Sequence, residues 1–183
     1  MIAMPSVFIS PSTQESKPYV DGGNEEYYMN LVADEMIPYL VASGITVGRN
    51  NPNESLRQAI NLSNAGNYDL HLALHSNAAP PNLSGQIQGT DVYYYTNSQR
   101  GQAAADIIAN NFKTIYPDPA RVKTVGSTSL AELRMTKAPA VLIEIAYHDN
   151  PQDAQWIRDN IGLIARNLAL SVTEYLGVPF VEP

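Results

Sequence analysis

A short apolar run near the C-terminal end of the chain, residues 140–143, leads directly into a carboxylate, Glu144. Continuous apolar runs of this length are typical of strands that are buried on both faces of a parallel sheet. A buried carboxylate is destabilising unless something compensates its charge, so Glu144 indicates catalysis or metal binding, or else a strand end that reaches solvent. His75 likewise lies at the outgoing end of a second strand-like segment, 68–77. The two segments together favour a functional site.

Strand-like and helix-like segments alternate along the chain. This order predicts an α/β fold with a mostly parallel, twisted sheet of about six strands and helices on both faces. The 183 residues fit a single domain, 1–183, with a core from about 6 to 176 and no repeat or linker inside it. The expected strands cover 6–10, 45–49, 70–74, 88–95 and 141–144, with short strands near Lys123 and Leu133, and the expected helices cover 24–43, 53–66, 98–116 and 151–176.

Capping residues set the expected beginnings of the first two helices. Asn24 is the predicted N-cap of the first helix, and Glu25 and Glu26 in its first turn suit the positive end of the helix dipole. Glu25 is expected to be solvated or to satisfy this dipole. Pro38 predicts a kink in the same helix, and Asn53 is the expected cap of the second.

Composition excludes several classes of site. The absence of cysteine excludes disulfides and thiolate ligands, so a transition metal would have to be held by His and carboxylate side chains. The net charge of −7, with eleven scattered Lys and Arg residues, argues against binding to nucleic acid. A hydrophobic fraction of 44% is typical of a soluble globular protein, and a neutral or mixed-charge partner such as a glycan or peptide fits the charge better.

Membrane and export signals are absent from the sequence pattern. No apolar run approaches the length needed to cross a bilayer, so membrane insertion is not expected. The first five residues lack a basic segment followed by an apolar one, so an export signal is not visible in this chain.

Three separate segments bring chemically active side chains to one edge of the expected sheet. His75 and Glu144 sit at the outgoing ends of inner strands, where sites form in open α/β sheets. Glu26 lies in the first turn of the helix that follows the first strand, near the same edge. One His and two carboxylates satisfy the needs of an open zinc site with a general base, since such a site leaves a position for water.

The chain resembles the zinc-dependent N-acetylmuramoyl-L-alanine amidases, in the catalytic-domain type of bacterial autolysins and phage endolysins. The resemblance runs from about residue 7 to 176, and the order and spacing of separate blocks make it specific. These blocks are Glu26 with the helix that follows it, Arg57 and Asn64 before the third strand, His75-Ser-Asn-Ala78, the aromatic strand from Gly89 to Tyr95, Leu133-Arg134, and Pro139 to Asn150.

The resemblance implies the roles of individual residues. Glu26 and His75 would bind Zn2+, and Glu144 would be the base that activates water and passes the proton to the leaving amine. Asn77 and Arg134 would contact the substrate, although structural ion pairing is an equal alternative for Arg134. The implied reaction cleaves the amide between N-acetylmuramic acid and L-alanine in peptidoglycan, in the cell wall or outside the cell, or after phage-type release from the cytoplasm.

One block departs from the family pattern. The family usually has a zinc-binding His in an Asp-Pro-Gly-His-like turn after the first strand, and here Thr13 or Gln14 occupies the matching place. Neutral hydroxyl or amide oxygens bind zinc weakly beside imidazole and carboxylate. Either Gln14 supplies a weak ligand, another residue such as His148 substitutes, or the metal site is degraded.

The remaining histidines are less suited to the missing position. His71 and His75 would share a face of one strand but lie roughly 13 Å apart at about 3.3 Å per residue, so His71 is expected to be a buried, hydrogen-bonded strand residue. His148 follows Glu144 on a loop at the same edge and is the better candidate, against the alternative of a loop His without a ligand role.

Two functions therefore remain open on the sequence. The first is an active zinc hydrolase of the cell wall. The second is a peptidoglycan-binding module of the same fold with a weakened metal site, and the turn that carries Thr13 and Gln14 is the feature that separates them. A nucleotide-binding protein lacks support, because no glycine-rich phosphate loop follows the first strand.

Overall fold

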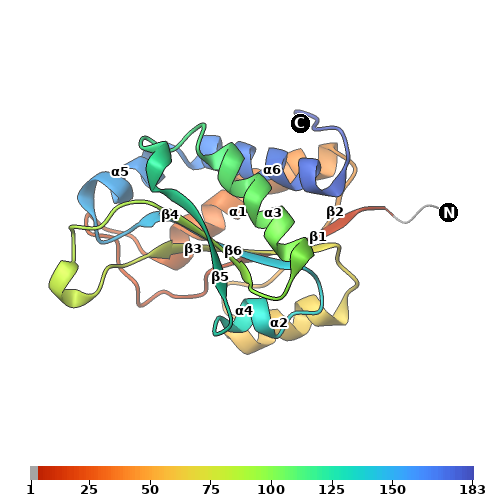
Figure 1. Ribbon diagram of the computed structural model, residues 1–183, viewed down its shortest axis with the longest axis horizontal. Coiled ribbons are helices and arrows are strands. Elements are labelled where there is room, and N and C mark those ends of the chain that lie inside the picture. The colour runs from red at the N-terminus through yellow and green to blue at the C-terminus, as the bar shows by residue number, and fades with distance from the viewer. Residues whose placement is uncertain (1–3) are drawn as a thin grey trace.

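Six strands form one sheet in the computed structural model, which describes residues 4–183 (Figure 1). The sheet order is β2-β1-β3-β6-β4-β5. The strands are β1 (Ser6–Pro11), β2 (Thr46–Arg49), β3 (Leu70–Asn77), β4 (Thr90–Tyr95), β5 (Val122–Ser127) and β6 (Ala140–Tyr147). The helices are α1 (Glu25–Ala42), α2 (Leu56–Ala65), α3 (Gln99–Phe112), α4 (Ala131–Arg134), α5 (Pro151–Asp159) and α6 (Ile161–Leu176), with short 3-10 turns at Pro81–Leu83 and Pro119–Arg121.

The sheet is mixed because one connection lacks a crossover helix. Strands β2, β1, β3 and β6 are parallel to one another, whereas β4 runs antiparallel to β6, and β5 is parallel to β4. Between β3 and β4 the chain forms only a loop with one 3-10 turn, and a parallel return would need a longer crossover. The start of β4 therefore lies at the same edge as the ends of β3 and β6, an edge that we call the carboxyl rim.

Helices cover both faces of the sheet, as predicted. In Figure 1, α1, α3 and α6 lie on one side of the strands, and α2 and α4 lie on the other. Leu70, Leu72 and Leu74 of β3 point into the large core under α1, α3 and α6. The opposite face holds a smaller cluster in which Ala73 packs with Leu133 of α4 and with partners from β6. The single-domain α/β fold with a mostly parallel sheet is thus confirmed.

Helix beginnings follow capping chemistry, with one difference from the prediction. Asn24 caps α1 as expected, since its side chain accepts a hydrogen bond from the backbone of Tyr27. For α2 the prediction of Asn53 was wrong, because Ser55 is the cap and forms a reciprocal capping box with Gln58. Helix α1 continues past Pro38 to Ala42.

The predicted short strand near Leu133 was also wrong. Residues Ala131–Arg134 form the single helical turn α4, and their side chains are all strong helix formers. The strand expected near Lys123 is present as β5. The change at α4 matters for function because it turns Glu132 toward the interior of the protein, where it is 3% exposed.

The sequence also led to expectations about export and about membrane insertion. Residues 1–3, part of the segment in which the sequence reveals no export signal, lie outside the described residues. Within residues 4–183, none of the helices combines the length and apolar character that a bilayer crossing requires.

Asp153 ties three elements together behind the carboxyl rim. Its Oδ2 accepts backbone N–H groups of Gly89, before β4, and Tyr147, at the end of β6, at 3.1 and 3.0 Å. Its Oδ1 accepts the hydroxyl of Tyr116 at 2.6 Å. The carboxylate itself is buried in the first turn of α5.

We expect Asp153→Ala to lower the free energy of unfolding by about 3 kcal/mol, because three buried donors lose their acceptor. Urea denaturation measures this, with Asp159→Ala on the exposed end of the same helix as the control. A loss under about 1 kcal/mol for Asp153→Ala would show that these donors find other partners.

Candidate active site at the carboxyl rim

Neighbouring strands place His75 and Glu144 side by side. His75 of β3 is in register with Glu144 of β6, and Glu144 is in register with Asp91 of β4 on its other side. Residues in register on adjacent strands point to the same face of the sheet. The three side chains therefore form a row across the carboxyl rim, as the sequence predicted for the first two.

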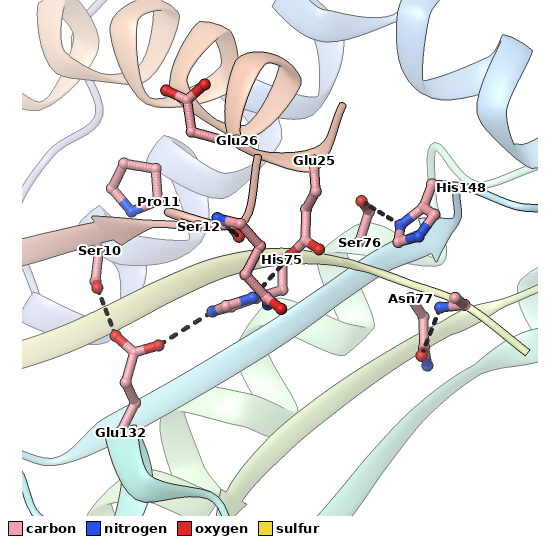
Figure 2. Close-up of polar contacts among 12 residues, drawn as sticks. Ser10, Pro11, Ser12, Glu25, Glu26, His75, Ser76, Asn77, Glu132 and His148 are labelled. Atoms are coloured by element: carbon pink, nitrogen blue, oxygen red, sulfur yellow. Dashed lines mark hydrogen bonds and ion pairs between the residues drawn. The ribbon is translucent and has the colours of Figure 1, made fainter. Parts of the chain in front are cut away.

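The imidazole of His75 lies between two carboxylates (Figure 2). Its Nδ1 is 2.8 Å from Oε1 of Glu25, and its Nε2 is 3.1 Å from Oε2 of Glu132. Glu25 and Glu132 are 2% and 3% exposed, so water screens these charges little. The contacts lie on opposite edges of the ring, and both ring nitrogens are engaged.

The two flanking carboxylates control the protonation of His75. Burial disfavours the imidazolium, but hydrogen bonds to Glu132 and Glu25 outweigh it and hold the pKa of His75 well above its usual value. Burial likewise opposes the charge of Glu132, but the hydrogen bonds from His71 and His75 hold the pKa of Glu132 well below its usual value.

Glu144 is an unpaired acid of the rim. Its Oε2 is buried and has no hydrogen-bond partner among residues 4–183. Burial raises the pKa of Glu144 from 4.5 to about 7, an effect that the charge of His75 opposes and those of Glu25, Asp91 and Glu132 reinforce. A carboxyl group with a pKa near neutrality can both accept and return a proton at physiological pH.

Glu25, and not Glu26, contacts His75. Figure 2 shows Glu25 reaching toward the imidazole while Glu26 points away from it, and Oε1 of Glu26 accepts a hydrogen bond from Asn30. The expectation that Glu25 is solvated was therefore wrong. Its burial was visible in the helical period, since the buried stripe of α1 through Met29 and Met36 extends back four residues to Glu25.

Sequence reasoning missed Glu132 and Asp91. Glu132 was hidden because the segment around it was expected to be a strand. Asp91 would have followed from the absence of a helix between β3 and β4, which fixes the direction of β4. Burial, opposed by the charge of Lys123, raises the pKa of Asp91 as well.

The two expected substrate contacts lie in different places. Asn77 is at the end of β3 on the rim, where its Oδ1 accepts the backbone N–H of Ala78. Arg134 is exposed and lines a cavity of about 220 Å³ with Arg100 and Ala140, at the amino end of β6. The structure therefore brings Asn77, but not Arg134, to the rim that carries Glu144.

Of the candidates for a third metal ligand, Thr13 and Gln14 lie near His75, whereas His148 does not face it. Thr13 and Gln14 line a hollow of about 170 Å³ together with His75 and Glu132. His148 instead pairs its Nδ1 with Oγ of Ser76 at 3.0 Å and stacks on a tyrosine ring, so the structure does not turn it toward His75 (Figure 2). Burial lowers the pKa of His148.

His71 is a buried strand residue, as expected. It is 0% exposed, and its Nδ1 and Nε2 pair with Oγ of Ser63 and Oε1 of Glu132 at 2.9 and 3.0 Å. Its ring stacks on Phe8 with centroids 5.4 Å apart. Both ring nitrogens are used inside the protein.

Two donor types that zinc accepts, an imidazole nitrogen and a carboxylate oxygen, meet at the rim in His75 and Glu25. A ring nitrogen and a carboxylate oxygen that already meet, as in His75 and Glu25, can share an ion after the loss of one proton. The unpartnered Oε2 of Glu144 marks a polar position next to this pair. Across residues 4–183, however, no three His, Asp or Glu side chains are arranged to hold one ion, so the set is one ligand short of the usual three.

Family and sequence comparisons agree with this architecture. Residues 11–174 match the family model described as N-acetylmuramoyl-L-alanine amidase. A relative named "Probable cell wall amidase LytH", from Staphylococcus aureus, is 28% identical over 139 residues. That match covers 75% of this chain but only 44% of the relative, so the chain spans less than half the length of this protein.

Solved structures share the fold. The catalytic domain of CwlV, an N-acetylmuramoyl-L-alanine amidase from Bacillus (Paenibacillus) polymyxa var. colistinus, is 21% identical with a TM-score of 0.82, covering 96% of this chain and 100% of that one. An N-acetylmuramoyl-L-alanine amidase from Clostridium difficile 630 is 19% identical with a TM-score of 0.83, covering 95% and 97%. At these identities the likeness establishes the fold.

The raised pKa of Glu144 makes stability depend on pH in the metal-free protein. The folded state binds this proton more tightly than the unfolded chain, so wild-type stability falls as the pH rises from 4.5 through about 7. Glutamine has no proton to lose. We expect Glu144→Gln to exceed wild type by about 3 kcal/mol at high pH and to match it at low pH.

Denaturant unfolding at several pH values in the presence of a chelator measures this difference. Glu35→Gln, on the exposed side of α1, is the matched control and should follow wild type throughout. A constant offset between Glu144→Gln and wild type at all pH values would contradict the raised pKa.

Proposed function

Because the chain belongs to the N-acetylmuramoyl-L-alanine amidase family, we propose that it hydrolyses the amide bond between N-acetylmuramic acid and L-alanine in peptidoglycan. The observation that carries the proposal is the buried, unpaired Glu144 beside the contact between His75 and Glu25. The name of the staphylococcal relative supports the cell wall as the place of action, either at the cell surface or after phage-type release.

The proposed metal is zinc, held by His75 and by a carboxylate from the start of α1. The family pattern suggests Glu26 for this carboxylate, and the 2.8 Å contact supports Glu25 instead. Zinc in this position would polarise the amide carbonyl and make a water molecule easier to deprotonate. An oxygen of Thr13 or Gln14, or water, would complete the ligand set.

Glu144 is the proposed general base. In the metal-free protein its pKa is about 7, and its carboxylate would take a proton from the attacking water. The same carboxyl group then returns the proton to the nitrogen of L-alanine as the amide bond breaks. Burial of Oε2 keeps solvent from competing for this proton.

Asn77 is the proposed substrate contact at the rim. Its side-chain oxygen is engaged with Ala78, which would leave its amide N–H groups to donate to the substrate. Two tyrosines near Glu144, Tyr93 and Tyr147, offer apolar surface for the sugar or the peptide stem. Arg134 has no part in this proposal, because it lies at the other end of β6.

A second candidate function is a peptidoglycan-binding module without hydrolysis. The observation that favours it is the absence of an imidazole at Thr13 and Gln14, which weakens the metal site. The two candidates differ in a simple measurement, since only the hydrolase releases new amino groups from purified cell wall.

We expect Glu144→Gln to bind zinc as wild type does and to lose cell-wall hydrolysis by about 100-fold or more, because charge and shape at the ligands persist while the base is lost. Release of L-alanine amino termini from purified peptidoglycan measures the rate, and zinc content is determined on the same samples. Hydrolysis by the variant at the wild-type rate would remove Glu144 from the mechanism. Wild-type protein that binds peptidoglycan but releases no amines would support the binding module.

The adjacent acids Glu25 and Glu26 form a matched pair for the metal site. We expect Glu25→Gln to weaken zinc binding by about 100-fold, since the oxygen facing Nδ1 of His75 loses its charge. Glu26→Gln should bind within about twofold of wild type, because its contact with Asn30 needs only a neutral oxygen. Zinc titration of the chelator-treated proteins measures both affinities. A larger loss in Glu26→Gln than in Glu25→Gln would show that Glu26 is the ligand.

A further inference from the structure

A cavity of about 220 Å³ lies at the edge of the sheet opposite the carboxyl rim, where β4 ends and β6 begins. Three cationic side chains line it: Arg100 from the start of α3, Arg134 from α4, and Lys137 from the loop before β6. Within residues 4–183, its lining includes no carboxylate. The proposed hydrolysis gives these three cations no role, although the resemblance singled out Arg134.

Among the described residues, the three cations have no acidic partner. Four other Arg side chains in residues 4–183 form ion pairs with Asp or Glu. No such pair in this part of the chain involves Arg100, Arg134 or Lys137, so structural ion pairing does not explain Arg134. Three like charges around one cavity repel one another, and a chain with a net charge of −7 has enough acids to pair them. Their convergence therefore indicates a site for an anion.

Arg100 stands where the local backbone opposes a cation. It is the second residue of α3, and the first turn of a helix carries partial positive charge. That turn contains no acidic residue, and its cap Ser98 also lines the cavity. Where a residue contradicts a local preference of this kind, a functional reason is expected. A bound anion would compensate both the guanidinium and the helix end.

Asn64 of α2 holds the loop that carries Lys137. Its Oδ1 accepts the backbone N–H of Lys137 at 2.8 Å, and its Nδ2 donates to the carbonyl of Met135 at 2.8 Å. Nζ of Lys137 donates in turn to the carbonyl of Asn64 at 3.0 Å. Helix α2 thus braces this loop on the side of the sheet that it shares with α4 (Figure 1). One wall of the cavity is therefore held in place before a ligand binds.

A phosphate group matches the donors of the cavity. Each guanidinium can donate paired N–H groups to two phosphate oxygens, and the ammonium of Lys137 adds a point charge. Three cations suit the charge of about −1 to −2 that a phosphate carries, which exceeds what one carboxylate supplies. The hydroxyls of Tyr95 and Ser98 are further donors in the lining. Nucleic acid would need an extended basic surface, and a single cavity in an acidic chain does not provide one.

The surroundings of Arg100 indicate that the phosphate carries a substituent. The cavity of about 220 Å³ is larger than the five heavy atoms of a bare phosphate require, since a water molecule takes about 30 Å³ in the liquid. Arg100 also lines a larger hollow of about 670 Å³ together with Tyr175 and Leu176. Asp69 lies in the lining of that hollow, so a neutral substituent fits there better than a second phosphate.

We propose that the cavity between Arg100, Arg134 and Lys137 binds a phosphate group that is esterified to a neutral polyol or sugar. This site needs neither zinc nor Glu144, and it lies at the edge of the sheet away from both. A phosphate-bearing ligand held there would leave the carboxyl rim free for peptidoglycan.

The test is a titration of the full chain, labelled with ¹⁵N and treated with chelator so that phosphate cannot bind through a metal. Inorganic phosphate, glycerol 3-phosphate and acetate are added separately at one pH and one ionic strength, and amide shifts are followed by NMR. The variants are Arg100→Gln, Arg134→Gln and Lys137→Gln. Lys113→Gln, at the opposite end of α3, is the matched control because it removes the same charge from an exposed position.

We expect both phosphates to give saturable shifts at residues 98–101 and 134–137, with glycerol 3-phosphate binding more tightly than inorganic phosphate. The dissociation constant should rise about fivefold in Arg100→Gln and in Arg134→Gln, and about twofold in Lys137→Gln, as exposed ion pairs allow. Lys113→Gln should bind as wild type does. All four side chains are exposed, so the variants should fold normally.

Shifts that do not saturate with either phosphate, or that acetate reproduces, would overturn the inference. An equal loss of affinity in Lys113→Gln and Arg134→Gln would overturn it too, because the effect would then be a general one of net charge. Inorganic phosphate that binds as tightly as glycerol 3-phosphate would reject the substituent and limit the site to the free anion. Because the titration needs neither zinc nor turnover, its outcome is independent of the proposed hydrolysis.

Discussion

The imidazole of His75, held between the carboxylates of Glu25 and Glu132, is the interaction on which the rim depends. Buried charges persist only with partners, and here one ring satisfies two acids that come from opposite sides of the sheet. With these two acids paired to His75, the buried oxygen of Glu144 is left without a hydrogen-bond partner in the described chain, and burial raises the pKa of Glu144 into the range that suits a base. The chemistry that we propose for Glu144 follows because Glu25 and Glu132 both contact His75, whereas the buried oxygen of Glu144 has no such partner among residues 4–183.

Sheet topology explains why these groups meet. The parallel strands β3 and β6 end side by side, and a loop in place of a crossover helix returns β4 to the same edge. Helix α1 begins above this edge and α4 lies below it, so Glu25 and Glu132 approach His75 from the two faces (Figures 1 and 2). The mixed sheet therefore brings acids from β4, β6 and two helices around a single histidine.

Much of this arrangement could be predicted from the sequence. Apolar runs predict the buried strands, and the carboxyl ends of parallel strands lie at one edge of the sheet. His75 and Glu144 were found in this way. The choice between Glu25 and Glu26 was harder, since the resemblance favoured one and the buried stripe of α1 favoured the other. The position of Glu132 could not be predicted, because a single helical turn is too short to show a helical pattern of apolar residues. Its partners His71 and Ser10 are also distant in sequence. Which of the ionisable groups pair is a property of tertiary packing, which local patterns do not encode.

The most direct test of the account is a crystal structure of the zinc-loaded protein with anomalous data at the zinc absorption edge. The account predicts one peak bonded to Nδ1 of His75 and to an oxygen of Glu25, with Nε2 of His75 still against Glu132. A peak on the Nε2 side, a peak at Glu26, or no peak at the rim would contradict it.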